Sequence, residues 1–391
     1  MNKMDIIGKN KSEIENRIKR IESAFPQFTV KDGIPTAIWE DEGTLLEHMK
    51  KFKVPGMSVA VINNYKLEWL KCYGIKNVET NDDVALNTLF EAGSASKAIT
   101  AAVLLSLVEN NDIKLNDAVN DNLLNWKIPD NQFTKDTKIN LKHLLTHTSG
   151  INRPDSMFGY EDNTKPTLEQ VLNGKSPAKN DPVEVQFTPG SKHQYSNFGY
   201  VIIQKYLEDI MDMSFPELMK KRLFDPLKMN NSQFGFRSKE DKDRAIVPHD
   251  QEGNARETGM HPVAHAMGGL LTTPQDLSVF LIDLMNAYNG KGTKHLTSTL
   301  AKTMLNAEIK LDPKATFGFT GQGLGMFLIE SESDLFFTHP GTNMPGATCM
   351  MIANASKGQG AVIMSNSITG ELVNAQLLFS IVKEYDWSLW K

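Results

Sequence analysis

Ser94 and Lys97, in the stretch FEAGSASKAIT (residues 90–100), are of types and at a spacing that could do chemistry. A serine hydroxyl is a poor nucleophile until a base accepts its proton. A lysine three residues later on a helix lies on the same face, one turn on, within reach of that hydroxyl. Burial beside an apolar helix lowers the pKa of the amine and favours its neutral form. The pair is therefore a candidate nucleophile and base for acyl transfer.

The same spacing also occurs at Ser176/Lys179, Ser380/Lys383 and Ser388/Lys391. The first of these pairs lies in a proline-bearing loop, the second inside the last expected helix, and the third at the C-terminal end. Ser94 alone follows a glycine and begins an apolar helix, whose N-terminal backbone N–H groups would stabilise an oxyanion. The other interpretation of Ser94, a simple helix N-cap, is compatible with this spacing.

Two further motifs carry polar groups suited to the same reaction. Tyr195-Ser196-Asn197 follows a Pro-Gly turn and precedes an amphipathic helix. His339-Pro340-Gly341 closes an apolar strand-like run. Neither Tyr-x-Asn nor His-x-Gly occurs elsewhere in the chain. Acyl transfer also needs a proton donor for the leaving group and donors for the oxyanion, and these motifs offer candidates for both.

GSASK, YSN and HPG stand in the order and rough separation of the three motifs of serine β-lactamases and penicillin-binding proteins. The chain resembles the branch that holds class C β-lactamases, DD-peptidases, D-aminopeptidases and related esterases. VPGMSVAV, LLTHTSGI and MGGLLTTPQDL also look like segments of this family. The resemblance covers roughly residues 40 to 385 and implies a β-lactamase/transpeptidase-like fold.

The resemblance also implies roles for individual residues. Ser94 would be the acylated nucleophile and Lys97 its proton acceptor. Tyr195 would pass the proton to the leaving group and help to activate the deacylating water. Asn197 would hydrogen-bond the amide on the acyl side of the substrate.

The third motif would supply the strand beside the substrate. Gly341 and Thr342 would line it, and the backbone N–H groups of Thr342 and Ser94 would form the oxyanion hole. His339 would take the catalytic-site position that lysine holds in β-lactamases, and Pro340 the position of a hydroxyl residue. Because a charged hydrogen bond contributes about 1.5–3 kcal/mol, these changes weaken binding of an anionic substrate end. We therefore expect esters or small peptide amides to be better substrates than β-lactams.

His339 also gives an expectation about pH. Histidine titrates near pH 6.5 unless its surroundings shift the pKa. We therefore expect activity to vary in mildly acidic buffer.

The elements around these motifs predict an α/β (α+β) fold. Residues Met57–Ile62 and Leu67–Tyr73 read as a hairpin around Asn63-Asn64. Strands are expected at Gly325–Ile329, Leu335–Thr338, Ala347–Ala353 and Ala361–Ser365, and helices at Ser12–Phe25, Ala98–Val108, in TTPQDLSVFLIDLMN and at Glu371–Tyr385. Strands at both ends of the sequence predict one antiparallel sheet built from both termini and flanked by helices.

The same reading predicts two domains. Residues 1–95 and 255–391 would form the sheet domain, and residues 96–254 a mostly helical inserted domain. The active site would lie in the cleft between them.

Composition narrows the functional class. The 391 residues are 40% hydrophobic and 23% charged, with a net charge of -5, which is typical of a globular protein without a nucleic-acid-binding surface. Cys72 and Cys349 stand in apolar runs and are expected to be buried thiols. No signal peptide or membrane span is visible, which favours a cytoplasmic location. We expect a small-molecule ester, peptide or amide as substrate and no cofactor.

Other activities stay open at this stage. His143/His147 and His261/His265 have the i, i+4 spacing of zinc ligands, but neither pair encloses a glutamate and Pro262 disrupts the second; no metal site is predicted. A β-lactamase, a DD-carboxypeptidase, an acyltransferase, and a non-catalytic binding module on the same fold remain alternatives. The sequence gives no indication of the oligomeric state.

Overall fold

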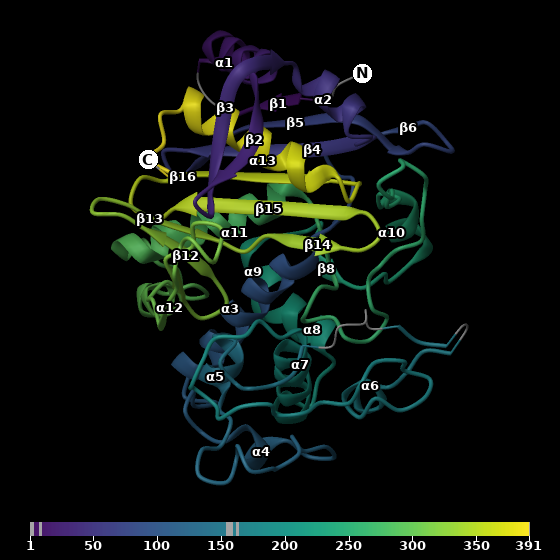
Figure 1. The fold of residues 1–391 in the computed structure, drawn as a ribbon, viewed down its shortest axis with the longest axis vertical. Coiled ribbons are helices and arrows are strands. Elements are labelled where there is room, and N and C mark those ends of the chain that lie inside the picture. The colour runs from purple at the N-terminus through teal and green to yellow at the C-terminus, as the bar shows by residue number, and fades with distance from the viewer. Residues whose placement is uncertain (1–3, 8–9, 154–158, 162–163, 391) are drawn as a thin grey trace.

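A large antiparallel sheet built from both ends of the chain forms the centre of the molecule (Figure 1). The structure is a computed structural model that describes residues 4–7, 10–153, 159–161 and 164–390, with the backbone alone at residues 40–42. The order of strands is β1-β5-β4-β16-β15-β13-β12-β11-β10, with β14 on β15 and β6 on β5. The strands of this sheet are β1 (Met4–Ile6), β4 (Gly56–Asn63), β5 (Lys66–Asn77), β6 (Asp82–Asp83), β10 (Ile309–Lys310), β11 (Gly321–Gln322), β12 (Phe327–Glu330), β13 (Leu335–Thr338), β14 (Gly341–Asn343), β15 (Ala347–Asn354) and β16 (Gln359–Ser365). The predicted sheet from both termini, with its antiparallel pairing, is confirmed.

The expected hairpin forms as β4 and β5, but its turn lies one residue later than predicted. Asn63 pairs with Lys66, so Asn64 and Tyr65 make the turn, with φ of 51° and 60°. Two positive φ values match a type I′ turn, whose twist suits a hairpin. Strand β12 begins at Phe327 instead of Gly325, because the chain is still turning at Gly325, where φ is 83°.

Two smaller sheets complete the strands. One pairs β2 (Phe25–Lys31) with β3 (Ile34–Gly43), and the other places β9 (Leu270–Thr272) between β7 (Phe90–Glu91) and β8 (Gln233–Phe234). The α-helices are α1 (Lys11–Ser23), α2 (Leu45–Lys51), α3 (Ser96–Glu109), α4 (Val119–Asn122), α5 (Leu141–Leu145), α6 (Leu168–Leu172), α7 (Asn197–Met211), α8 (Phe215–Met219), α9 (Asp225–Leu227), α10 (Lys239–Arg244), α11 (Pro274–Asn286), α12 (Ser298–Met304) and α13 (Gly370–Glu384).

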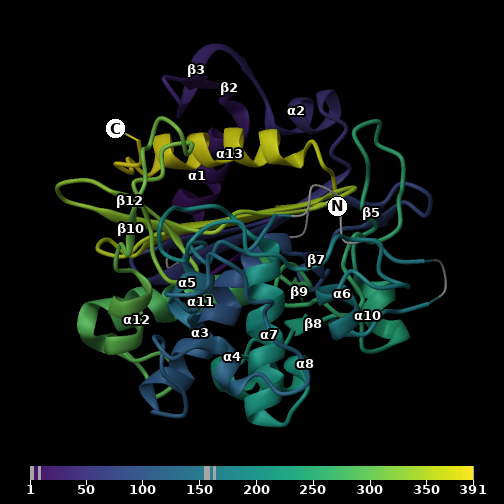
Figure 2. The same ribbon diagram turned by 60° about the horizontal axis from the view of Figure 1, so that its bottom comes forward.

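Helices cover both faces of the large sheet (Figure 2). Val59 and Val61 of β4 pack with α1 and α13, whereas Ala60 and Ile62 pack with α3 and α11. This alternation follows from the two-residue period of a strand. The expected helices at the N-terminus and at residues 98–108 are confirmed, with slightly different ends.

Helix α13 corrects one detail of the sequence analysis. The expected apolar face was Leu372, Ala375, Leu378, Phe379 and Val382. In the structure Val373, Leu377 and Ile381 are fully buried, while Leu372 and Ala375 are only half-buried. The helix is therefore apolar on two sides, and one of those sides is incompletely covered.

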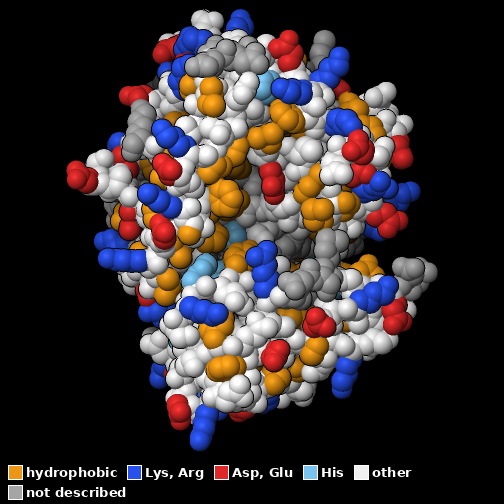
Figure 3. Space-filling view, viewed as in Figure 1, with side chains coloured by type: hydrophobic (Ala, Val, Ile, Leu, Met, Phe, Trp, Pro, Cys, Tyr) orange, Lys and Arg blue, Asp and Glu red, His pale blue; other side chains and the backbone are white. Residues whose placement is uncertain are grey.

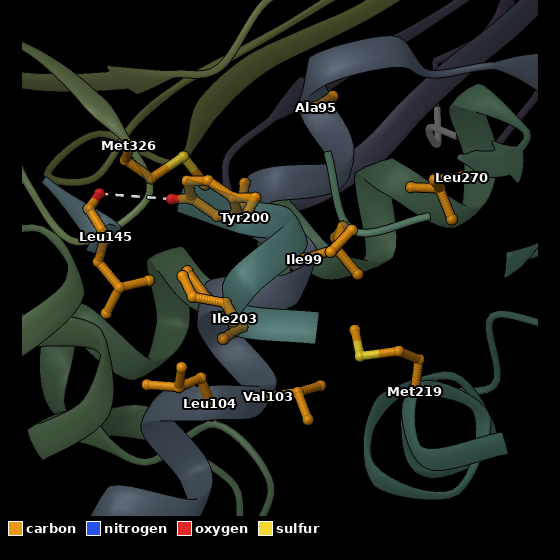
Figure 4. Packing of buried hydrophobic residues seen from close by; sticks show 14 of the residues in the cluster. Ala95, Ile99, Val103, Leu104, Leu145, Tyr200, Ile203, Met219, Leu270 and Met326 are labelled. Carbon is orange, nitrogen blue, oxygen red and sulfur yellow. Dashed lines mark hydrogen bonds between the residues drawn. The ribbon is translucent and has the colours of Figure 1, made fainter. Parts of the chain in front are cut away.

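A hollow opens in the face of the molecule seen in Figure 3, with hydrophobic side chains around it. Below the sheet in Figure 1 lies the predominantly helical middle of the chain. One apolar core continues from the sheet into α3 and α7 (Figure 4). In that core the Tyr200 hydroxyl donates to the carbonyl of Leu145 over 3.3 Å. The exact division into two domains stays a prediction.

Cys72 and Cys349 are buried and form no disulfide with each other, as expected. None of the helices in the described part of the chain is long and apolar enough to cross a membrane.

Candidate active site

Ser94 lies in a 3-10 turn, Gly93–Ala95, between β7 and α3. The N-cap of α3 is Ala95, so the interpretation of Ser94 as a simple helix cap is wrong. Gly93 has φ of 51°, and a Cβ on it would lie 2.5 Å from the backbone nitrogen of Thr342. Both observations require glycine. Gly93 therefore allows the serine turn and the third motif to approach closely.

Lys97 lies in the first turn of α3 and is completely buried. Its Nζ donates to Ser94 Oγ over 3.0 Å and also contacts the carbonyl of Met267. Burial lowers the pKa of the amine well below its usual value, and the positive charge of Arg153 lowers it further. A lysine that is neutral near pH 7 can accept the proton of the serine hydroxyl.

The other Ser-x-x-Lys pairs have different surroundings. The Ser176 hydroxyl donates to Glu161, and the Ser380 hydroxyl donates to the carbonyl of Ala24 over 3.0 Å. Lys391, the lysine of the pair with Ser388, lies outside the described residues.

Tyr195 stands just before Ser196, the N-cap of α7. Contacts of Ser196 and of His147 hold this part of the chain in place. The Ser196 side chain accepts from the backbone N–H of Gly199 and caps the helix. The Ser196 N–H donates to His147 Nδ1 over 3.2 Å, and the His147 ring lies 4.2 Å from the Tyr195 ring. His147 thus holds the backbone that leads from Tyr195 into α7.

The Tyr195 side chain faces both members of the first motif. It hydrogen-bonds Ser94, and Lys97 Nζ lies 5.2 Å from the centroid of its ring. Burial raises the pKa of the phenol, and the hydrogen bond and Arg153 oppose this only in part. Tyr195 is therefore a protonated donor beside the Lys97 amine.

Asn197 is the first residue of α7 and lines the same cavity as Ser94. Its Oδ1 is buried and has no hydrogen-bond partner among the described residues. A buried acceptor without a partner costs about 1–3 kcal/mol, so a ligand N–H is a favourable partner for it.

His339 follows β13 and is 1% exposed. Its Nδ1 donates to the carbonyl of Pro340 over 3.0 Å, which leaves Nε2 unprotonated and buried without a partner. Burial, aided by the charge of Lys97, lowers the pKa of His339 to about 3. The expected titration near pH 6.5 is therefore wrong, because the ring is neutral throughout mildly acidic buffer.

Gly341 and Thr342 belong to β14, which pairs with β15. A Cβ on Gly341 would lie 1.9 Å from the carbonyl oxygen of Ala92 and 2.9 Å from the nitrogen of Ser94. This absence of a side chain lets the backbone of β14 lie directly against the serine turn. Asn343 fixes the strand further, since its Nδ2 donates to the buried Glu91 over 2.9 Å.

Two charged residues of the site were not found from the sequence. The Arg153 guanidinium lies 5.7 Å from the centroid of the Tyr195 ring. Glu371, the second residue of α13, accepts a hydrogen bond from the Thr342 hydroxyl. Arg153 stands in an irregular loop and Glu371 is far along the chain, so no local pattern could have joined either to Ser94.

Ser94, Tyr195, Asn197, His339, Gly341 and Thr342 all line one cavity of about 1230 Å³, which opens on the face shown in Figure 3. Lys97 lies directly behind Ser94. The structure thus brings together the seven residues to which the family resemblance assigns a role.

The two histidine pairs differ from a metal centre. His147 accepts from a backbone N–H, and His261 Nδ1 accepts from the backbone N–H groups of Val263 and Ala264. Within the described ranges, no group of three or more His, Cys, Asp or Glu side chains is placed to hold a metal ion.

Solved structures with this fold include penicillin-binding-protein relatives. The chain matches the structure of the octameric penicillin-binding protein homologue from Pyrococcus abyssi with a TM-score of 0.71 and 25% identity, over 88% of this chain and 76% of that one. It matches the crystal structure of SurE with a TM-score of 0.69 and 21% identity, over 87% and 74% of the two chains. The expected β-lactamase/transpeptidase-like fold is confirmed.

Curated relatives include two kinds of staphylococcal protein. Protein flp from Staphylococcus aureus strain MW2 is 25% identical over 345 residues, which are 83% of this chain and 62% of that protein. The chain thus spans less than two thirds of the length of this relative. Teichoic acid D-alanine hydrolase from S. aureus strain MRSA252 is 31% identical over 177 residues, 45% of this chain and 40% of that protein. The family model described as Beta-lactamase matches residues 42–378, and the chain belongs to that family.

Proposed function

We propose that this chain is a serine hydrolase that cleaves an ester or an amide through an acyl-enzyme on Ser94. The observation that carries the proposal is the contact of a buried Lys97 amine with the Ser94 hydroxyl, at 3.0 Å, together with the lowered pKa of that amine. Family membership supports the same chemistry.

The first half of the reaction transfers the acyl group to the protein. The Ser94 hydroxyl gives its proton to the Lys97 amine, and Oγ forms a bond with the carbonyl carbon of the substrate. The bond from that carbon to the leaving oxygen or nitrogen then breaks. Tyr195, which faces both groups, passes the proton from the lysine to the leaving group.

The second half releases the acyl group as a carboxylic acid. Water attacks the ester carbon and gives one proton to the Tyr195 and Lys97 pair, which returns it to Ser94 Oγ as the bond breaks. In both halves, the backbone N–H groups of Ser94 and Thr342 are proposed to stabilise the oxyanion, because Gly93 and Gly341 hold those backbones in contact.

Esters and small amides are proposed as better substrates than β-lactams. His339 is neutral, Pro340 has neither an N–H nor a hydroxyl group, and Glu371 adds a carboxylate beside Thr342. A carboxylate next to the anionic group of a penicillin would repel it.

A second candidate is the release of a D-amino acid from its ester or amide. One relative is named a teichoic acid D-alanine hydrolase. Such a substrate carries an ammonium group, for which the exposed Glu371 carboxylate in the cavity is a suitable partner.

Intact-mass spectrometry of acyl adducts tests the proposal. The protein is mixed with p-nitrophenyl acetate, D-alanine p-nitroanilide and nitrocefin, and compared with the Ser94→Ala and Ser380→Ala variants. We expect an adduct with at least one ester or amide that Ser94→Ala abolishes and Ser380→Ala retains. An adduct that persists in Ser94→Ala contradicts the proposal, and nitrocefin turnover as fast as ester turnover contradicts the substrate preference.

A further inference from the structure

The cavity at Ser94 is larger than a short acyl group needs. Its volume of about 1230 Å³ exceeds the roughly 300–1,000 Å³ that is usual for small-molecule sites. Ser94, Tyr195, Asn197 and His339 line one part, which we call the reaction chamber. The cavity continues from there over the face of the sheet toward α13, and this second part we call the apolar arm.

Hydrophobic side chains make up much of the lining of the apolar arm. The floor is the sheet, with Ile329 on β12 and Ile352 on β15. One wall is α13, where Leu372 and Ala375 are the half-buried residues of its incompletely covered side. Phe28 of the β2–β3 hairpin, which packs against α13, also lines the cavity.

The β2–β3 hairpin and a loop before β11 meet above this floor and close the arm into a roofed passage. A Cβ on Gly33, at the hairpin turn, would lie 1.8 Å from the carbonyl oxygen of Lys314. A Cβ on Gly318 would lie 2.5 Å from the indole nitrogen of Trp390 and 3.3 Å from Pro35. The hairpin and the loop are therefore in direct contact, and Figure 1 shows the hairpin crossing α13 toward the strands below.

Aromatic rings connect the two parts of the cavity. The rings of Tyr195 and Phe327 are nearly parallel, with centroids 6.5 Å apart, and Phe319 stacks on Phe327 at 4.6 Å. Phe319 and Phe327 both line the cavity. An apolar chain that leaves the reaction chamber therefore meets ring faces before it reaches the arm.

Few charged groups line the cavity. Among the described residues that line the cavity, the charged ones are Arg153 and Glu371. Arg153 lies over Tyr195, and Glu371 accepts from Thr342. The arm thus offers neither a counter-ion nor a dense set of hydrogen-bonding groups, which disfavours a peptide, sugar or phosphate there.

We infer that the apolar arm binds a hydrocarbon chain of the substrate, so that the preferred substrate is a lipid-like ester or amide with a medium or long chain. This inference rests on the proposed function and names its substrate class. Water leaves the arm when the chain enters, and each methylene that is buried there strengthens binding. Because the arm is continuous with the reaction chamber, that binding holds the scissile bond beside Ser94.

Two series of esters test the inference and show which side of the bond carries the chain. In one series, p-nitrophenyl butyrate and p-nitrophenyl decanoate carry the chain on the acyl side. In the other, butyl acetate and decyl acetate carry it on the alcohol side. Below the critical micelle concentration, we expect kcat/KM to rise at least about tenfold with chain length in one series. No rise in either series overturns the inference.

A substitution in the arm should remove this preference. Ala375→Trp places an indole where the chain would lie, and we expect the decanoate-to-butyrate ratio of kcat/KM, or the decyl-to-butyl ratio, to fall at least about fivefold. Ala315→Trp is the matched control, because Ala315 is exposed on the loop that roofs the arm and does not line the cavity. An unchanged ratio in Ala375→Trp contradicts the inference.

A binding measurement separates this inference from the proposed function. Calorimetry on Ser94→Ala with 1-decanol and 1-butanol needs no turnover, and we expect 1-decanol to bind at least about tenfold more tightly. If no ester is cleaved by the native protein but decanol binds, the proposed function fails and the arm stands. If esters are cleaved without a chain-length preference and decanol does not bind, the inference about the arm fails and the proposed function stands.

Discussion

The start of α3 and the end of α13 carry the same Ser-x-x-Lys spacing with different results. At the start of α3, Lys97 Nζ contacts Ser94 Oγ at 3.0 Å in a fully buried setting. At the end of α13, Ser380 donates to a backbone carbonyl, and the exposed Lys383 lies 3.7 Å from the centroid of the Trp39 ring. Spacing places two residues on one helix face, but the surroundings decide whether they meet.

The position of each serine within its helix explains the difference. Ser380 lies inside α13, where its hydroxyl bonds the Gln376 carbonyl four residues earlier, as serines in helices often do. Ser94 precedes α3, so it has no such carbonyl to bond and its hydroxyl is available to Lys97. Lys97 is enclosed by the protein, whereas Lys383 extends into solvent. A serine in contact with a lysine of lowered pKa is therefore a property of the buried helix start.

The largest effect expected from this comparison is that of Ser94→Ala. Removal of the nucleophile should lower kcat for the best ester by about 10⁴-fold or more. Ser380→Ala should leave kcat unchanged. Steady-state kinetics on both variants, with circular dichroism to check folding, measures this. Retained turnover in Ser94→Ala would mean that another group is acylated.

Loss of the base should have the next largest effect. Lys97→Met removes the proton acceptor while keeping an apolar side chain of similar length, and kcat should fall by about 10²- to 10⁴-fold. Lys383→Met should not change kcat, because the Lys383 amine lies over the Trp39 ring and Lys383 does not line the cavity of Ser94. Single-turnover acylation rates show whether the loss occurs in the first half of the reaction. A rate equal to that of the native protein would exclude Lys97 as the base.

The contact of β14 with the serine turn gives a third prediction. Gly341→Ala adds a Cβ that would overlap the Ala92 carbonyl, so the Thr342 N–H would move away from the oxyanion. We expect kcat to fall by about 10²- to 10³-fold. Gly199→Ala in α7 is the matched control, since the nearest atom to its Cβ would be 3.5 Å away. Equal activity of the two variants would argue against an oxyanion donor in β14.

The pH dependence distinguishes Lys97 from His339. The lowered pKa of Lys97 predicts that kcat/KM falls as the pH drops through that pKa and the amine becomes charged. His339, whose pKa is about 3, stays neutral in mildly acidic buffer. His339→Gln should therefore leave the midpoint of the fall in kcat/KM unchanged. A shift of the midpoint by a full pH unit in His339→Gln would instead assign the titration to the imidazole.

The same histidine affects stability in a defined pH window. The pKa of His339 is about 3 in the folded protein and about 6.5 in the unfolded chain. Its contribution to the unfolding free energy is therefore complete above pH 6.5 and is lost as the pH falls toward 3. His339→Gln should therefore reduce the slope of unfolding free energy against pH in that interval. Urea denaturation at several pH values measures the slope, and an unchanged slope would contradict the burial of a neutral ring.

The smallest effect concerns Ser380. The Ser380 hydroxyl hydrogen-bonds to two backbone carbonyls, and the variant leaves those carbonyls in place without this partner. Ser380→Ala should therefore lower the unfolding free energy by about 0.5–1.5 kcal/mol. Thermal denaturation gives this value. A loss of activity without a loss of stability would undo the contrast between the two helices.

Local patterns predicted the parts of the site that depend on local geometry. The contact of Ser94 with Lys97 follows from helix spacing, and the strands that carry the third motif follow from alternating apolar residues. The neutral state of His339 could not be predicted, because it depends on burial by segments distant in sequence. Arg153 and Glu371 reach the site for the same reason, through the packing of a loop and of α13.

The segment that matches the family model, residues 42–378, contains all of the reaction chamber but not the whole roof of the apolar arm. Nearly all of the β2–β3 hairpin lies before that segment, and Trp390 lies after it. The two ends of the chain thus help to cover the apolar arm, and they also supply buried core residues such as Ile18, Phe25 and Trp387. Substitutions of the cavity-lining residues in those ends, such as Phe28 and Trp390, are therefore expected to change which molecules enter the arm while leaving the reaction chamber intact.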